Sequence, residues 1–175
     1  MLLSFLKKPV LRFLFTVLVL YLLFYFIYNF WIHPNETIDL FVVDLTIFLS
    51  RLILEAMGYS VFTGTERVIG VDGTGGLWIG DNCNGITLFI LFAVFIMAYK
   101  GNAKTKLIFI SLGILSLQLL NVLRVVGLAI LDTYSRAWTE FNHTYTFNFL
   151  IYGYIFFLWM IWVNKYAHIN TSPKS

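Results

Sequence analysis

The sequence predicts an all-α integral membrane protein: a four-span transmembrane helical bundle with an outer amphipathic helix and a small β-hairpin. Hydrophobic residues fill 59% of its 175 positions and charged residues only 12%, against roughly 45–50% and about 25% in soluble domains. Four apolar runs also reach about 20 residues, the length that crosses a bilayer. This hydrophobicity excludes a disordered chain, and a soluble globule would have too few charges to cover its surface.

The four apolar runs define spans within one membrane domain, residues 1–175. The expected spans are approximately residues 13–32, 83–99, 107–131 and 147–163, with an outer region at residues 33–82. The first run is longer than the core of a signal peptide, which has about 7–15 residues, and no A-x-A site follows it. We therefore expect this run to remain in the protein as an anchor.

The basic residues predict how the chain is oriented. In a four-span arrangement most of them share one side, which the positive-inside rule assigns to the cytoplasm. They are Lys7, Lys8, Arg12, Lys100, Lys104, Lys106, Lys165 and Lys174. Both termini are thus expected in the cytoplasm, in a cell (inner) membrane. The net charge of +3 comes from residues that are not clustered as a nucleic-acid-binding face requires, so no nucleic acid partner is expected.

Residues 37–57 could be taken for a fifth span, but Asp39, Asp44, Arg51 and Glu55 interrupt them. At 100° per residue, Asp44, Arg51 and Glu55 fall within about 40° of one another on a helix. A fifth span would also reverse the side of the lysines in residues 100–106. Two interpretations remain: an amphipathic helix on the outer leaflet, or a helix packed on the bundle.

The pattern changes from helical to extended before the second span. Residues 59–63, 67–71 and 76–80 are short stretches rich in β-branched and aromatic residues. Asp72-Gly73, between the last two stretches, is a hairpin turn signal. A small outer β-hairpin is therefore expected to lead directly to the second span.

The chain has one cysteine, Cys83, which stands at the start of the second expected span. Asp81 and Asn82 are residues that commonly cap helices, so the thiol is expected in or beside the first helical turn. A helix N-terminus favours the nucleophilic thiolate, and Gly85 allows another backbone to approach closely. The alternative is that the cysteine is a small buried hydrophobic residue.

Arg124 lies within the third expected span. It follows Leu107 by 17 residues, so at 1.5 Å per residue it is about 26 Å from the inner end, near the outer boundary of the hydrocarbon core. Gln118 and Asn121 precede it at three-residue steps and share its face. The stripe predicts an inward-facing polar site, and the alternative is an arginine that snorkels to the headgroups.

His143 stands in the outer loop before the fourth expected span. Because neighbouring spans run antiparallel, Cys83, Arg124 and His143 are all expected at the outer membrane face. A thiol nucleophile, an imidazole base and a fixed cation together suit acyl transfer through a thioester. The three histidines are scattered over both sides of the membrane, so we expect no metal and no other cofactor.

These motifs resemble the exosortase/archaeosortase family of membrane cysteine transpeptidases. They are Cys83-Asn84-Gly85 at a span start, Asn121-x-x-Arg124 in a later span, and His143 in the following outer loop. The resemblance covers roughly residues 76–154, and the short four-span form resembles the exosortase F type. It departs from the family at Asn84, where serine or alanine is common.

The resemblance implies a role for each site residue. Cys83 would be the nucleophile, Arg124 would stabilise the thiolate or the oxyanion, and His143 would act as general acid and base. The expected supporting residues are Asn82, Asn84, Gly85 and Asn121.

The resemblance also implies substrates. These would be exported proteins with a C-terminal motif, a transmembrane helix and a basic tail, cleaved at the outer face of the lipid bilayer. The alternative is a non-enzymatic membrane assembly partner or small transporter that uses Gln118, Asn121 and Arg124 as polar contacts between helices. An intramembrane hydrolase would need paired Asp or Ser/His residues within the spans, and the sequence has neither arrangement.

Overall fold

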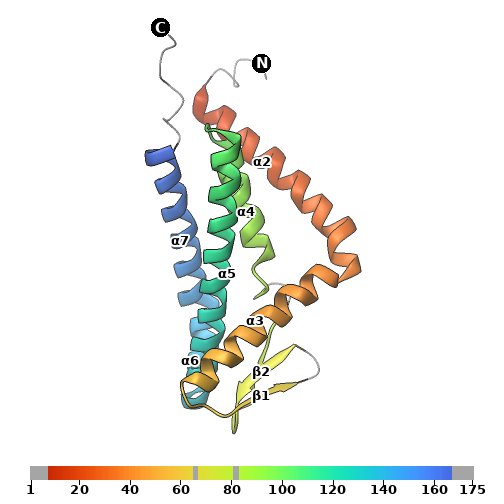
Figure 1. Ribbon diagram of the computed structural model, residues 1–175, viewed down its shortest axis with the longest axis vertical. Helices are drawn as coiled ribbons and strands as arrows, with labels where there is room; N and C mark the ends of the chain where they lie inside the picture. The colour runs from red at the N-terminus through yellow and green to blue at the C-terminus, as the bar shows by residue number, and fades with distance from the viewer. Residues whose placement is uncertain (1–7, 65–66, 81–82, 167–175) are drawn as a thin grey trace.

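Helices make up most of the chain, and a small sheet lies at one end of it (Figure 1). The computed structural model describes residues 8–64, 67–80 and 83–166. Its α-helices are α2 (Pro9–Ile27), α3 (Thr37–Ala56), α4 (Ile86–Ala98), α5 (Ala103–Tyr134), α6 (Arg136–Phe141) and α7 (Phe147–Ile161). Its strands are β1 (Val61–Gly64), β2 (Val68–Val71) and β3 (Leu77–Trp78). Short 3-10 and π-helical turns, η1 (Tyr28–Ile32), η2 (His33–Asn35), η4 (Asn142–Thr146) and η5 (Trp162–Tyr166), extend or join the helices.

Within the described residues, three helices are long and apolar enough to cross a membrane. They cover Pro9–Asn35, Ala103–Tyr134 and Arg136–Tyr166, where the first, third and fourth spans were expected. The second expected span forms α4, which has only 13 residues. At 1.5 Å per residue α4 is about 20 Å long, shorter than the hydrocarbon core of about 30 Å.

The long helices pack through an apolar core between α4, α5 and α7. Its buried members are Phe92, Ile96, Leu117, Ile151, Ile155 and Trp162. Gly113 of α5 is essential to the close approach of α4, because a Cβ atom there would lie 2.2 Å from the Phe92 ring. The start of α5 is fixed by Asn102, whose side chain accepts a hydrogen bond of 2.8 Å from the Lys104 amide.

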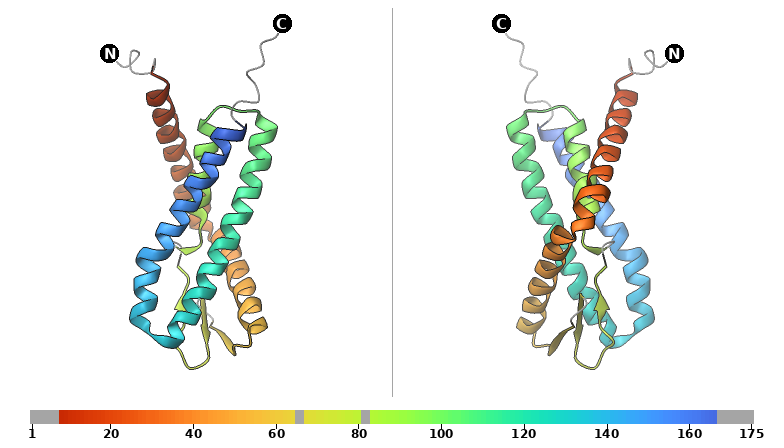
Figure 2. Two further views of the ribbon diagram at one scale, coloured as in Figure 1. Left: turned by 90° about the vertical axis from the view of Figure 1, so that its left-hand side faces the viewer. Right: turned by 90° about the vertical axis from the view of Figure 1, so that its right-hand side faces the viewer.

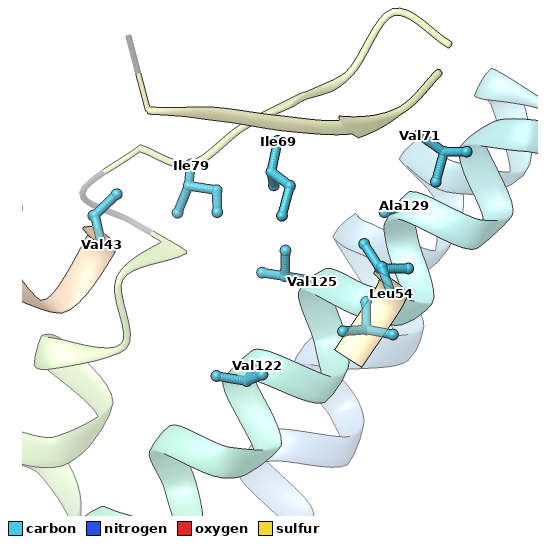
Figure 3. Packing of buried hydrophobic residues seen from close by; sticks show 9 residues of the cluster. Val43, Leu54, Ile69, Val71, Ile79, Val122, Val125 and Ala129 are labelled. Atoms are coloured by element: carbon cyan, nitrogen blue, oxygen red, sulfur yellow. The ribbon is translucent and has the colours of Figure 1, made fainter. Parts of the chain in front are cut away.

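A second core joins α3 and the sheet to the far half of α5 (Figure 3). Its buried members are Val43, Leu54, Ile69, Val71, Ile79, Val122, Val125, Val126 and Ala129. Residues 37–57 therefore form a helix packed on the bundle, as one of the two interpretations proposed. The exposed side of α3 carries Asp44, Arg51 and Glu55, whereas Asp39 is buried.

The expected hairpin is present and has a third strand. The strand β2 pairs antiparallel with β3 on one side, across the turn at Asp72 and Gly73, and with β1 on the other. In the β2–β3 pair, Val68 stands opposite Trp78 and Ile69 opposite Leu77. The order β1-β2-β3 makes β3 an edge strand, and β3 leads towards Cys83.

The elements alternate between two ends of the molecule (Figures 1 and 2). The start of α2, the end of α7 and the connection between α4 and α5 lie at one end. The sheet, the end of α3 and α6 lie at the other, and α4 begins partway along α5. The described segments that were expected on the cytoplasmic side thus share one end of the fold.

Candidate active site

Cys83 lies in a short turn between the sheet and α4. Its backbone N–H donates to the Gly80 carbonyl at 2.8 Å, and the helix begins three residues later at Ile86. The thiol is therefore beside the first helical turn and not within it. Gly85 holds a φ of 86° as the residue before the helix, a conformation that favours glycine. The expected capping residues Asp81 and Asn82 lie outside the described residues.

His143 contacts the thiol directly. Its Nε2 atom lies 3.2 Å from the Cys83 sulfur, within hydrogen-bond distance. The histidine stands in the π-helical turn η4, which leads into α7. The distance allows a proton to pass directly between the sulfur and the ring nitrogen.

Arg124 reaches the same sulfur from α5. Its Nη2 atom lies 4.0 Å from the Cys83 Sγ, at the long end of a hydrogen bond to sulfur. Only 6% of the arginine is exposed. The snorkelling alternative is wrong, because the side chain points into the protein towards the thiol. An anion formed on the sulfur would face a buried positive charge.

Asn121 holds the backbone of the cysteine. Its Nδ2 atom donates to the Cys83 carbonyl at 3.1 Å, and a Cβ atom on Gly85 would lie 3.6 Å from that same Nδ2. Gln118, one turn earlier, does not face the thiol but donates to Thr46 Oγ1 of α3 at 2.8 Å. The polar stripe of α5 is thus divided between the site and the contact with α3.

Asn84 connects the cysteine turn to a buried carboxylate that the sequence analysis missed. Its Oδ1 accepts from the Ile86 amide at 2.9 Å, and its Nδ2 donates to Asp39 Oδ1 at 2.6 Å. Asp39 is fully buried, accepts from the Tyr28 hydroxyl at 2.6 Å, and lies 3.2 Å from Nδ1 of His33. The junction of α2 and α3 thereby anchors the residue after the thiol. The sequence does distinguish Asp39 from the other charges of α3: on a helix it lies outside the arc of about 40° that contains Asp44, Arg51 and Glu55.

A pocket of about 300 Å³ opens beside the thiol. Its lining is shared between β3, α5 and α6 and the turns beside them. It is formed by Leu77, Trp78, Ile79, Cys83, Asn121, Arg124, Val125, Leu128, Arg136, Thr139, Glu140, His143 and Thr144. The pocket gives a substrate room next to the sulfur.

The arrangement suits nucleophilic catalysis. A thiol, an imidazole in contact with it, a guanidinium and an adjoining pocket are the parts of a covalent acyl-transfer site. Among the described residues, no three His, Cys, Asp or Glu side chains group as a metal site would need. His33 and His143 belong to different clusters, and His168 lies outside the described residues.

Comparison with known proteins gives a family match. The family model described as transmembrane exosortase (Exosortase_EpsH) matches residues 1–164. No curated protein and no solved structure matches the chain.

Proposed function

The chain belongs to the transmembrane exosortase family, and on that premise we propose that it is a membrane cysteine transpeptidase or protease. Family membership makes it a multi-pass integral membrane protein and implies that it processes sorting signals. In our proposal it cleaves the C-terminal sorting signals of exported proteins through a thioester on Cys83. The exosortase F type remains a prediction from the sequence.

The observation that carries the proposal is the 3.2 Å contact between the Cys83 sulfur and His143 Nε2. His143 takes the thiol proton, and the sulfur forms a bond to the carbonyl carbon of the scissile peptide. The tetrahedral intermediate collapses to a thioester as the peptide nitrogen leaves with a proton from His143. An acceptor amine or water then attacks the thioester, gives its proton to His143, and releases the sulfur as a thiolate.

Arg124 stabilises the charges that this sequence produces. Its guanidinium stands 4.0 Å from the sulfur and donates towards the thiolate or towards the oxyanion of the tetrahedral intermediate. Asn121 contributes by holding the Cys83 carbonyl at 3.1 Å. Positioning donors before the reaction is a large source of rate enhancement, because they need no reorganisation when charge develops.

We also propose a four-span topology with both termini in the cytoplasm and the site at the outer face. Asn121, which contacts the cysteine, follows the start of α5 at Ala103 by 18 residues. At 1.5 Å per residue this is about 27 Å, close to the thickness of the hydrocarbon core. The site would meet the sorting motif where it leaves the membrane.

The test is replacement of Cys83 by serine and by alanine, with analysis of the C-terminal tails of exported proteins in the same cells. Both variants should abolish tail removal and remain inserted, because little volume changes in the turn before α4. Near-wild-type processing by Cys83→Ser would show that the thiol is not the nucleophile. Equal amounts of membrane-inserted protein in all three strains are the required control.

One observation favours a second function, a membrane assembly partner or small transporter. The hydrogen bond between Gln118 and Thr46 joins α5 to α3 and is a typical polar contact between helices. The other two members of the stripe, Asn121 and Arg124, contact Cys83 instead. A membrane-impermeant thiol reagent added from outside separates the two functions: rapid labelling of Cys83 supports the enzyme, and protection supports the assembly partner.

A further inference from the structure

We propose that the substrate binds as an additional extended strand along the edge of β3 that is turned away from β2, with its scissile carbonyl at Cys83 and an apolar side chain in the adjoining pocket. This inference rests on the proposed function and specifies how its substrate is held. It depends on three features: the direction of the peptide groups of β3, the position of the pocket, and the chemistry of its walls.

The hydrogen-bond register shows which peptide groups of β3 point away from β2. The Ile79 amide donates to the Arg67 carbonyl at 2.9 Å, so residues 79 and 67 form a hydrogen-bonded pair. Bonded and non-bonded pairs alternate along an antiparallel ladder. Val68 and Trp78 are therefore a non-bonded pair, and the N–H and C=O of Trp78 are directed out of the sheet edge.

The pocket lies along that edge. Leu77, Trp78 and Ile79, three consecutive residues, all line it. Because successive side chains of a strand point to opposite faces, consecutive residues share a pocket through their backbone edge. Arg136 of α6 gives independent support, since its Nη1 donates to the Gly76 carbonyl at 3.0 Å. The Gly76 carbonyl points away from β2, as the N–H and C=O of Trp78 do. This edge of β3 therefore faces α6 across the pocket.

The length of β3 suits one short peptide partner. Long exposed edges recruit other chains and lead to aggregation, but β3 has only two residues. An extended peptide that pairs with an edge gains affinity from main-chain hydrogen bonds and specificity from alternate side chains. Cys83 lines the same pocket, so a strand on this edge passes its backbone beside the sulfur.

The walls of the pocket indicate the class of side chain that enters. Leu77, Ile79, Val125 and Leu128 form an apolar surface. The charged lining residues already have partners: Arg124 faces the Cys83 sulfur, and Arg136 lies 3.5 Å from the exposed Glu140. An uncharged, apolar residue next to the scissile bond fits this lining, because burying a charge beside these residues is costly without a partner. A volume of about 300 Å³ accommodates a short stretch of peptide.

The first experiment alters the peptide and leaves the protein unchanged. The probe is the chloromethyl ketone of acetyl-Ala-Leu-Ala-Leu-Ala, applied to the purified full-length chain in lipid vesicles. The Cys83 sulfur forms a bond to the methylene carbon, and chloride leaves with the electron pair. In a series of probes, one backbone N–H at a time is replaced by N-methyl. We expect the rate of alkylation to fall about 2- to 10-fold at alternate positions, while iodoacetamide, which has no backbone, reacts unchanged.

The second experiment alters the edge itself. Trp78→Pro removes an N–H that does not bond to β2, and edge strands tolerate proline. That N–H donates to a carbonyl of the bound probe, so reaction with the peptide ketone should slow by about 2- to 10-fold. Methylation of the probe N–H that donates to the carbonyl of residue 78 should keep its effect, because proline retains that carbonyl. Trp78→Ala, the control for the side chain, retains the N–H and should slow the reaction less than Trp78→Pro. If Trp78→Pro does not fold, the series of N-methylated probes on the unaltered protein is by itself the test of strand binding.

The outcomes separate this inference from the function on which it rests. An effect of N-methylation that is the same at every position, or a peptide ketone that reacts no faster than the chloromethyl ketone of alanine alone, overturns strand binding even where processing in cells depends on Cys83. Processing that continues in Cys83→Ala overturns the proposed function and not the edge site. Alternating sensitivity supports strand addition at β3.

Discussion

Replacing Arg124 by methionine removes a positive charge that stands 4.0 Å from the Cys83 sulfur. At that separation a unit charge pair interacts by about 1 kcal/mol in water and about 4 kcal/mol at the effective dielectric constant of 20 that applies near protein surfaces. Each 1.4 kcal/mol is about a factor of ten in a population. Reactions that proceed through the Cys83 anion should therefore slow by about fivefold to about a thousandfold when this attraction is removed.

The assay is the rate of alkylation of Cys83 by iodoacetamide, measured as a function of pH on the purified protein in micelles. The chain contains one cysteine, so no other thiol contributes. The rate for Arg124→Met should lie below that of the unaltered protein at neutral pH, because the reaction proceeds through the thiolate that Arg124 faces. Arg124→Lys keeps the charge but loses the planar fork of donors, so it should alkylate faster than Arg124→Met and still process substrate poorly.

Two controls make the result decisive. Arg51→Met makes the same substitution on the exposed side of α3, where Arg51 pairs with Glu55 at 2.6 Å, and should leave the alkylation rate unchanged. Thermal unfolding of Arg124→Met should match the unaltered protein, because methionine within a span is less costly than arginine. Superimposable pH profiles for Arg124→Met and the unaltered protein would refute the electrostatic reasoning.

Three further predictions concern the base, the buried carboxylate and the topology. His143→Ala should lower processing by about 10²- to 10⁴-fold, the usual contribution of a general base, without preventing alkylation of the thiol; unchanged turnover would exclude it as the base. Asp39→Ala removes the acceptor of the Asn84 amide and should destabilise the protein by about 1–3 kcal/mol in denaturant unfolding, whereas Asp39→Asn, which retains an oxygen, should cost less. Lys104→Cys in a Cys83→Ala background should resist an impermeant thiol reagent added from outside, and labelling of this variant would contradict the proposed topology.

The meeting of Cys83, Arg124 and His143 could be anticipated from the sequence. Cys83 begins one apolar run, Arg124 lies in the outer part of the next, and His143 precedes the last. Consecutive runs joined by short loops are antiparallel. This topology places the start of α4, the far half of α5 and the start of α7 together without any knowledge of side-chain packing. The chemical roles of the three residues came from the resemblance to a known family. The geometry brings the residues together, and experiment must test the roles.

The buried carboxylate could not be anticipated in the same way. Asp39 meets Tyr28, His33 and Asn84, and the last of these is 45 residues away in the chain. Helical periodicity separates Asp39 from the other charges of α3 but does not say what its carboxylate contacts. Tertiary packing determines which side of α3 faces α5 and the start of α4, and one sequence does not reveal that packing.

The extra strand and the short second span have local causes that a hydropathy pattern does not capture. Turn chemistry at Asp72 and Gly73 identified one hairpin, but β1 joins the sheet through pairing of Val61 with Val71, across a connection that the sequence analysis did not identify as a turn. In the second span, Gly85 adopts a φ of 86°, which stops the helix from extending back to Cys83. The apolar residues that follow are continuous, so hydropathy alone places the start of the span too early.

The late start of α4, at Ile86, explains why an asparagine follows the nucleophile. Buried backbone that is not helical is stable only where the protein itself satisfies its polar groups. Here the Cys83 amide bonds to the Gly80 carbonyl, the Cys83 carbonyl accepts from Asn121, and the Ile86 amide bonds to Asn84 Oδ1. A serine at position 84 could cap the helix but is too short to reach the Asp39 carboxylate as well. The turn that exposes the thiol is thus held by side chains from α5 and from the start of α3, and the reactive group is positioned by the same hydrogen bonds that permit the helix to begin late.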